Sequence, residues 1–254
     1  MTTLALDRET IGATRAPDPT WRDLYRAGGV SALLTTLSYI LALVIVFTVP
    51  PTPTAGGAAI LEYIATHRSS YIVQQALWLL PSVLLIIVFL ALYPALKGVN
   101  KSYAAISVVL SIVAWAVTLA YPVTGGGAPA LVVLSDQYTA VASDAPRAAL
   151  AAAAESFIAL NSVPSVMGVL EAIGILLVSL LMLKSVFSQR VVYLGIVTGA
   201  IGIICETLRP LLGPGYAVYG LLLFVWLPLL GWQLYKLGRV REATYQGTDN
   251  QPAP

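Results

Sequence analysis

Long uninterrupted runs of apolar residues alternate with short polar segments along this chain. A helix needs about 20 residues to cross the hydrocarbon core of a bilayer. Six runs reach that length, and each is expected to form a membrane-spanning helix: residues 28–49, 73–96, 103–122, 163–183, 191–210 and 216–236. The pattern therefore predicts an all-α, polytopic membrane protein, with a bundle of six transmembrane helices between residues 28 and 237.

The segments outside these runs are unequal in length. A polar segment of 27 residues precedes the first run, and residues 238–254 form a polar tail that is expected to be disordered. The connection at 123–162 is the longest, and loops of that size usually have structure or purpose of their own.

A surface helix is predicted inside this long connection, at residues 144–160. Asp144 or Ser143 can act as its N-cap, and Pro146 suits its first turn. Leu150 and Phe157 fall on one face of an Ala-rich sequence, and they are expected to seat the helix along the outer surface. The preceding stretch, APALVVLSDQY, is compatible with a second short helix or with a strand.

The basic residues predict the orientation of the chain. Lys and Arg are retained on the cytoplasmic side of a membrane during insertion. If six spans are present, eleven of the 14 basic residues lie on the side of the two termini, and Arg68, Arg147 and Arg209 lie on the other. Both termini are therefore expected in the cytoplasm, and the protein in the inner membrane of the cell.

Composition supports the membrane class and excludes several others. Hydrophobic residues make up 58% of the chain and charged residues 10%, whereas soluble domains carry about 25% charged residues. The net charge of +2 comes from dispersed basic residues, so no nucleic-acid partner is expected. The chain has one histidine, His67, and one cysteine, Cys205, so we expect no metal site and no cofactor.

Two acidic residues fall inside the predicted spans, Glu171 and Glu206, and Arg209 follows Glu206 by one helical turn. A charge at the centre of a membrane helix costs about 2.5–3.5 kcal/mol on insertion scales, so such residues tend to face the protein interior in pairs. From the flanking residues Lys184 and Arg190, the two glutamates lie roughly 20 and 24 Å along their helices. Both are thus expected in the outer half of the bilayer.

These three residues are the candidate site, and two interpretations of them are open. In the structural one, Glu206 and Arg209 form an i,i+3 ion pair, while Glu171 bonds a backbone or Tyr partner. In the functional one, an acidic pocket binds a ligand or a proton. Either way, we expect Glu171, Glu206 and Arg209 to meet in one buried polar cluster, because small residues such as Gly168 and Gly199 permit close helix approach.

The opening stretch WRDLYRAGGVSALL, residues 21–34, resembles the start of a bacterial membrane family that is known as a domain of unknown function. In that family a W-x-x-L-Y-R-x-G-G-like stretch leads into the first of six spans, and a long outer loop follows the third. The resemblance implies the fold, a bacterial origin and no particular activity or catalytic residue.

Three classes of function are compatible with this sequence. The first is an accessory or small-ligand- or lipid-binding membrane protein, whose partners are the bilayer and other membrane subunits. The second is a small proton-coupled transporter that uses Glu171 and Glu206. A membrane enzyme acting on a lipid or isoprenoid ranks last, because the chain lacks a Ser-His set, a second histidine and an Asp-rich motif.

Overall fold

The computed structural model describes residues 18–121, 127–161 and 165–239, and every regular element within these ranges is a helix. Most of the long helices belong to one bundle: α2 (Arg22–Thr48), α4 (Arg68–Leu96), α5 (Lys101–Ala120), α8 (Val166–Met182), α9 (Gln189–Thr207) and α11 (Ala217–Leu237). The shorter elements are η1 (Pro19–Trp21), α3 (Gly57–Thr66), α6 (Ala130–Ala140), α7 (Asp144–Asn161), α10 (Arg209–Leu212) and η2 (Gly213–Tyr216). The all-α prediction is confirmed.

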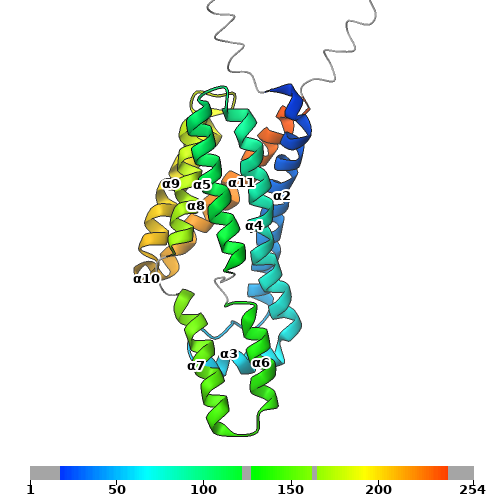
Figure 1. Ribbon diagram of the computed structural model, residues 1–254, viewed down its shortest axis with the longest axis vertical. Coiled ribbons are helices and arrows are strands. Elements are labelled where there is room, and N and C mark those ends of the chain that lie inside the picture. Colours follow the sequence, from blue (N-terminus) through cyan, green and yellow to red (C-terminus); the bar gives the residue numbers. More distant parts are fainter. Residues whose placement is uncertain (1–17, 122–126, 162–164, 240–254) are drawn as a thin grey trace, which may run out of the picture.

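The bundle helices form a closed ring in which each helix packs against its neighbours in the chain order of the bundle, and α11 closes the ring against α2 (Figure 1). Their interior is filled by large apolar side chains from α4, α8 and α11, among them Phe89, Ile175 and Trp226. Many large apolar side chains also point outward, including Phe47, which is 84% exposed. An apolar exterior around an apolar core is expected of a protein whose solvent is lipid.

Five helical segments are long and apolar enough to cross a membrane: Pro19–Thr48, Arg68–Leu96, Lys101–Ala120, Gln189–Thr207 and Arg209–Leu237. The predicted fourth span, 163–183, corresponds to α8, which is apolar but has 17 described residues. Residues 162–164 lie outside the described part of the chain, as do residue 122 and the tail from 240 onward. The first two spans begin earlier than predicted, at Arg22 and Arg68, because polar residues continue these helices beyond their apolar parts.

Helix α4 shows how a proline is accommodated inside the bundle. Pro81 lies in the helix interior, where its missing N–H leaves the carbonyl of Leu77 without its helical donor. The hydroxyl of Ser38, on α2, donates to that carbonyl at 2.7 Å. A side chain of the neighbouring helix thus satisfies a backbone group that lipid could not.

At the end of the bundle opposite the start of α2, the helices α3, α6 and α7 form a small domain of their own (Figure 1). Its core contains Ile60, Leu61 and Ile64 of α3 with Leu131 and Ala154 from α6 and α7. Gly57 is required at the crossing of α3 and α7, because a Cβ there would lie 1.8 Å from the carbonyl oxygen of Ala151. We call this unit the α3/α6/α7 domain.

The predicted helix at 144–160 is present as α7, and Leu150 and Phe157 pack on the core of the α3/α6/α7 domain. Its setting differs from the prediction, since α7 extends away from the bundle beside α6 instead of lying along the surface (Figure 1). The stretch that was open between helix and strand is the helix α6, and α3 was not predicted. These helices pack their apolar faces against one another, so their sequences need not contain apolar runs of membrane length.

The end of the bundle where α2 begins is held together by polar contacts. The Arg26 guanidinium donates to the carbonyl of Gly238 at 3.1 Å, and Lys97 pairs with Asp18 at 2.7 Å. The connections between α4 and α5 and between α8 and α9 also lie at this end (Figure 1). The structure therefore brings the start of α2, the end of α11 and these two short loops to one end.

Candidate functional site

The charged residues of the predicted site lie where α9 ends and the chain turns into α11. Helix α9 ends at Thr207, and the short helix α10 begins at Arg209. Gly213 then adopts a φ of 48°, a left-handed conformation that glycine tolerates. The turn of η2 follows, and it returns the chain so that Tyr216 lies beside Glu206.

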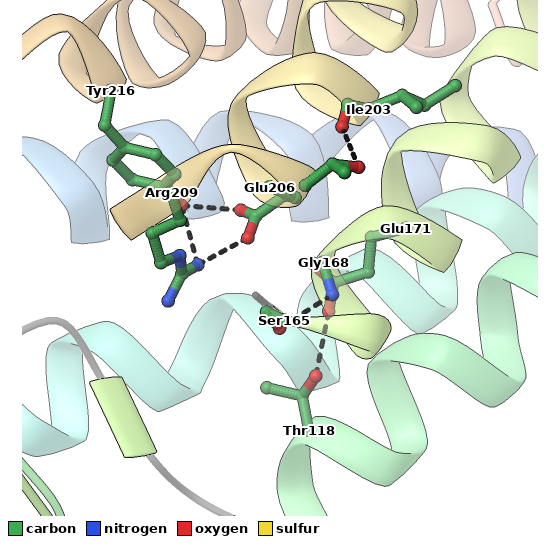
Figure 2. A network of polar contacts seen from close by, with 9 residues as sticks. Thr118, Ser165, Gly168, Glu171, Ile203, Glu206, Arg209 and Tyr216 are labelled. Carbon is green, nitrogen blue, oxygen red and sulfur yellow. Dashed lines mark hydrogen bonds and ion pairs between the residues drawn. The ribbon is translucent and has the colours of Figure 1, made fainter. Parts of the chain in front are cut away.

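Glu206, Arg209 and Tyr216 form a triad of mutually bonded side chains (Figure 2). Arg209 Nη2 lies 2.6 Å from Glu206 Oε2 and donates to it. The Tyr216 hydroxyl donates to Glu206 Oε1 at 2.5 Å and accepts from Arg209 Nη2 at 2.9 Å. Both carboxylate oxygens of Glu206 therefore have a donor, and one donor carries the opposite charge.

The predicted ion pair between Glu206 and Arg209 is confirmed. Glu206 is buried, with 3% of its surface exposed, whereas the side chain of Arg209 is 24% exposed. The guanidinium also stands 4.8 Å from the centre of the Tyr216 ring, in cation–π geometry. Within the triad, the Arg209 guanidinium balances the charge of the buried Glu206 carboxylate and itself remains partly exposed.

Helix α8 passes the triad at Gly168. A Cβ at this position would lie 2.3 Å from Glu206 Cδ, so only a residue without a side chain leaves room for the carboxylate. A similar restriction holds about two helical turns along the same interface, where a Cβ at Gly199 would lie 2.6 Å from the backbone nitrogen of Leu176. The small residues that predicted close approach of these helices therefore serve two needs, backbone contact and space for Glu206.

Glu171 lies one turn beyond Gly168 on α8 and has a different partner. Its Oε1 accepts from the Thr118 hydroxyl of α5 at 2.8 Å, and 9% of its surface is exposed. The prediction that Glu171 bonds a backbone group or a Tyr is therefore wrong. Figure 2 shows the Glu171–Thr118 pair and the triad as neighbours with no bond drawn between them. Among the described residues, the predicted cluster consists of these two adjacent networks.

Thr118 and Tyr216 are the members of the site that sequence reasoning missed. The signal for Tyr216 was the GPG turn after Arg209, which reverses the chain within a few residues. Thr118 is a hydroxyl-bearing residue in an apolar run, at the end of α5 that adjoins the long connection. Nothing in the sequence indicated that α5 is the helix that faces Glu171.

Long apolar helices packed in one bundle, with paired charges inside it, define a polytopic α-helical membrane protein. The chain belongs to the family described as a domain of unknown function (DUF4386), whose family model matches residues 27–240. The predicted family resemblance is thus confirmed, and the match begins within the WRDLYRAGG stretch that suggested it. No curated protein and no solved structure matches the chain.

Proposed function

We propose that the protein is a six-span protein of a bacterial inner membrane, with both termini in the cytoplasm, and that it binds a small ligand at Glu171. The count of six depends on whether helix α8 crosses the membrane. It packs between α5 and α9 and runs with them along the bundle (Figure 1). Its 17 residues extend roughly 26 Å at the rise of an α-helix, close to the ~30 Å of a hydrocarbon core.

The orientation is supported by the basic residues at the end where α2 begins. Lys97, Lys101, Lys184 and Arg190 belong to the loops or helix starts at this end. The α3/α6/α7 domain at the opposite end carries Arg147, and α4 begins beside it with Arg68. With the positive side retained in the cytoplasm, the α3/α6/α7 domain lies outside.

A single observation carries the binding role: the two buried glutamates are satisfied to different degrees. Glu206 has a donor on each oxygen and a cation beside it. Among the described residues, Glu171 has a single hydroxyl donor and forms no ion pair. When two carboxyl groups have such different environments, they are suited to different roles. The triad is the structural element, and Glu171 is free to bind.

The hydrogen bonds that Thr118 can make favour one protonation state of Glu171. Thr118 has one hydroxyl proton and two acceptors within reach, the carbonyl of Ala114 at 3.1 Å and Glu171 Oε1 at 2.8 Å. A hydroxyl donates once, so an ionised Glu171 competes with the carbonyl for that proton. A protonated Glu171 donates to the Thr118 oxygen, and Thr118 then donates to Ala114. The protonated form uses both hydroxyl protons, whereas an ionised Glu171 has one neutral donor among the described residues for its two oxygens.

The ligand that suits this site is a proton or a small molecule that hydrogen-bonds a neutral carboxyl. The same observation favours a second candidate function, proton-coupled transport. A buried carboxyl that carries a proton without a fixed counter-charge is a common element of proton relays in membrane proteins. The two candidates share Glu171 and differ in whether the proton moves across the membrane.

Infrared difference spectroscopy of the protein in lipid tests the proposal. Wild-type protein is expected to show the C=O band of a protonated carboxyl at neutral pH, and Glu171→Gln is expected to remove it. Glu206→Gln and Glu155→Gln, an exposed residue of α7, are controls that leave the band in place. Absence of the band from wild type, or its persistence in Glu171→Gln, would contradict the proposal.

Proteoliposomes that contain a trapped pH dye separate the two candidates. If the protein transports protons, an imposed pH gradient should dissipate faster with wild type than with Glu171→Gln. If it only binds, the two should be equally slow while the infrared band still distinguishes them. Thr118→Ser, which keeps the hydroxyl, should resemble wild type in both measurements, and Thr118→Val should shift the band.

A further inference from the structure

A hollow lies away from the glutamates, between α2 and α4 at the end of these helices that adjoins α3. Its volume is about 330 Å³, which is within the range of small-molecule pockets. Leu43 and Val46 of α2 and Trp78 of α4 form its apolar wall, while Tyr63, Ser70 and Gln74 supply polar groups. We call it the Gln74 pocket.

Gln74 is the residue that makes this hollow a candidate site. It is buried, with 6% of its surface exposed, and its side chain makes no hydrogen bond with any described residue. A buried amide can donate twice and accept twice, and leaving it unsatisfied is unfavourable. Because Gln74 lines the pocket, a ligand there would meet an unused donor and an unused acceptor.

The pocket is held in shape by contacts that do not involve Gln74. The Tyr63 hydroxyl donates to the carbonyl of Pro50 at 2.7 Å, which fixes the segment after α2 against α3. The ring of Tyr39 packs against Trp78 at 5.5 Å between ring centres. A pre-formed wall lowers the cost of binding, because little has to be ordered when the ligand arrives.

The lining indicates a neutral ligand with an apolar part. None of the described Asp, Glu, Lys or Arg residues lines the pocket, so a charged group placed there would be desolvated without a partner. Beside it, a second hollow of about 470 Å³ lies between α2 and α11, lined by Ile40, Phe47 and Phe224 among other apolar residues. Leu43 lines both hollows, so an apolar chain can continue from one into the other.

We infer that the Gln74 pocket binds a neutral single-chain lipid, with its hydroxyl or ester group on the Gln74 amide and its hydrocarbon chain in the hollow between α2 and α11. The polar half of such a molecule matches the Gln74 pocket, and its apolar half matches the hollow between α2 and α11. The site is independent of Glu171, since it involves neither α8 nor α9. Its ligand also reaches the protein directly from the bilayer.

The test uses full-length protein in nanodiscs and a diazirine-bearing monoacylglycerol as the photoreactive probe. Label is expected within residues 40–49 and 70–78 after peptide mapping, and unlabelled monoacylglycerol should compete more strongly than phosphatidylglycerol. Gln74→Leu should reduce labelling roughly five- to tenfold, the effect of one hydrogen bond. Val46→Trp, which fills the pocket from a half-exposed position, should abolish it.

Val30→Trp is the matched control, because Val30 is similarly exposed on α2 but lines neither hollow. Val30→Trp should be labelled to the same extent as wild type, and so should Glu171→Gln. A negative infrared result for Glu171 would therefore not count against lipid binding in the Gln74 pocket. Label spread evenly over the lipid-facing helices would overturn the inference. So would labelling that survives both Gln74→Leu and Val46→Trp, or phosphatidylglycerol competing equally well.

Discussion

At the scale of single residues, three buried polar groups in this protein accept hydrogen bonds from side chains that come from other helices or from beyond a turn. Glu206 accepts a hydrogen bond from the Tyr216 hydroxyl, and Glu171 accepts one from the Thr118 hydroxyl. The carbonyl left without a helical donor by Pro81 accepts one from the Ser38 hydroxyl. In a bilayer such groups have no water to replace a missing partner. The energetic effect of removing one partner should therefore be measurable.

We expect Glu206→Gln to destabilise the protein more than Arg209→Lys. The first change leaves the guanidinium without a counter-charge, whereas the second keeps a cation within reach of the carboxylate. Because Arg209 is 24% exposed, it can partly hydrate, and the loss should be about 1–2 kcal/mol instead of the 3–5 kcal/mol of a fully buried broken pair. Unfolding by SDS titration in mixed micelles measures it, and a larger loss in Arg209→Lys would refute the assignment.

Ser38 and Pro81 should be coupled energetically. Ser38→Ala is expected to cost about 1–2 kcal/mol, because the carbonyl of Leu77 loses its donor. In a Pro81→Ala background the cost should be smaller, since the alanine N–H can bond the same carbonyl within α4. A double-mutant cycle of unfolding free energies gives the coupling directly. Equal costs in the two backgrounds would show that the hydroxyl does not replace the missing helical donor.

At the scale of elements, glycines set how closely the helices approach. Gly199 lets α9 contact the backbone of α8 at Leu176, and Gly29 and Gly231 do the same for α2 and α11. Such small residues are typical of packed membrane helices, where lipid supplies no hydrophobic force between them. The contacts are to backbone atoms, which cannot rotate away from an added methyl group.

Gly199→Ala should therefore destabilise the bundle by about 1–3 kcal/mol, the usual cost of overpacking. The matched control is Gly220→Ala in α11, where an added Cβ meets nothing within 4 Å. That control should be neutral or slightly stabilising, since alanine favours helix by about 1 kcal/mol over glycine. Thermal unfolding in one detergent compares the two, and equal melting temperatures would contradict the close approach of α8 and α9.

Gly57→Ala should loosen α7 from α3 and leave the bundle intact. The added Cβ would overlap the carbonyl oxygen of Ala151, so α7 must move. Trypsin should then cleave faster after Arg147, at the start of α7, than it does in wild type or in the control Ala65→Ser, which changes an exposed residue of α3. Unchanged cleavage at Arg147 would argue against this packing.

At the scale of the whole molecule, the structure has two unlike ends. One holds the start of α2, the end of α11 and the two short loops, and the other holds the α3/α6/α7 domain and adjoins the polar site (Figure 1). The triad and Glu171 therefore lie nearer to the α3/α6/α7 domain than to the end where α2 begins. In the orientation that we propose from the distribution of Lys and Arg, that side faces the outside of the cell.

Cysteine labelling in intact cells should confirm this orientation. In a Cys205→Ser background, a cysteine at Ala149 on α7 should react with a membrane-impermeant reagent. A cysteine at Ser188, in the loop between α8 and α9, should react only after the cells are opened. Both positions are exposed in the structure, so accessibility depends on the side of the membrane. The reverse pattern would invert the topology, and reaction of both in intact cells would rule out α8 as a span.

The sequence by itself determined the features that depend on local geometry. Apolar length identified the long helices, and a spacing of three residues identified the pair of Glu206 and Arg209, because one helical turn brings such residues together. The helix at 144–160 followed from its N-terminal residues and its apolar face for the same reason.

Only the tertiary structure decided which helix faces which. A helix that is apolar all round shows no preferred face, so nothing in the sequence specified Thr118 as the partner of Glu171 or Ser38 as the donor to Leu77. Tyr216 reaches Glu206 through a turn whose direction depends on the packing of α9 and α11. The Gln74 pocket likewise exists because α2, α3 and α4 meet around it. Relative rotation and register of helices are long-range properties, and the packed bundle sets them.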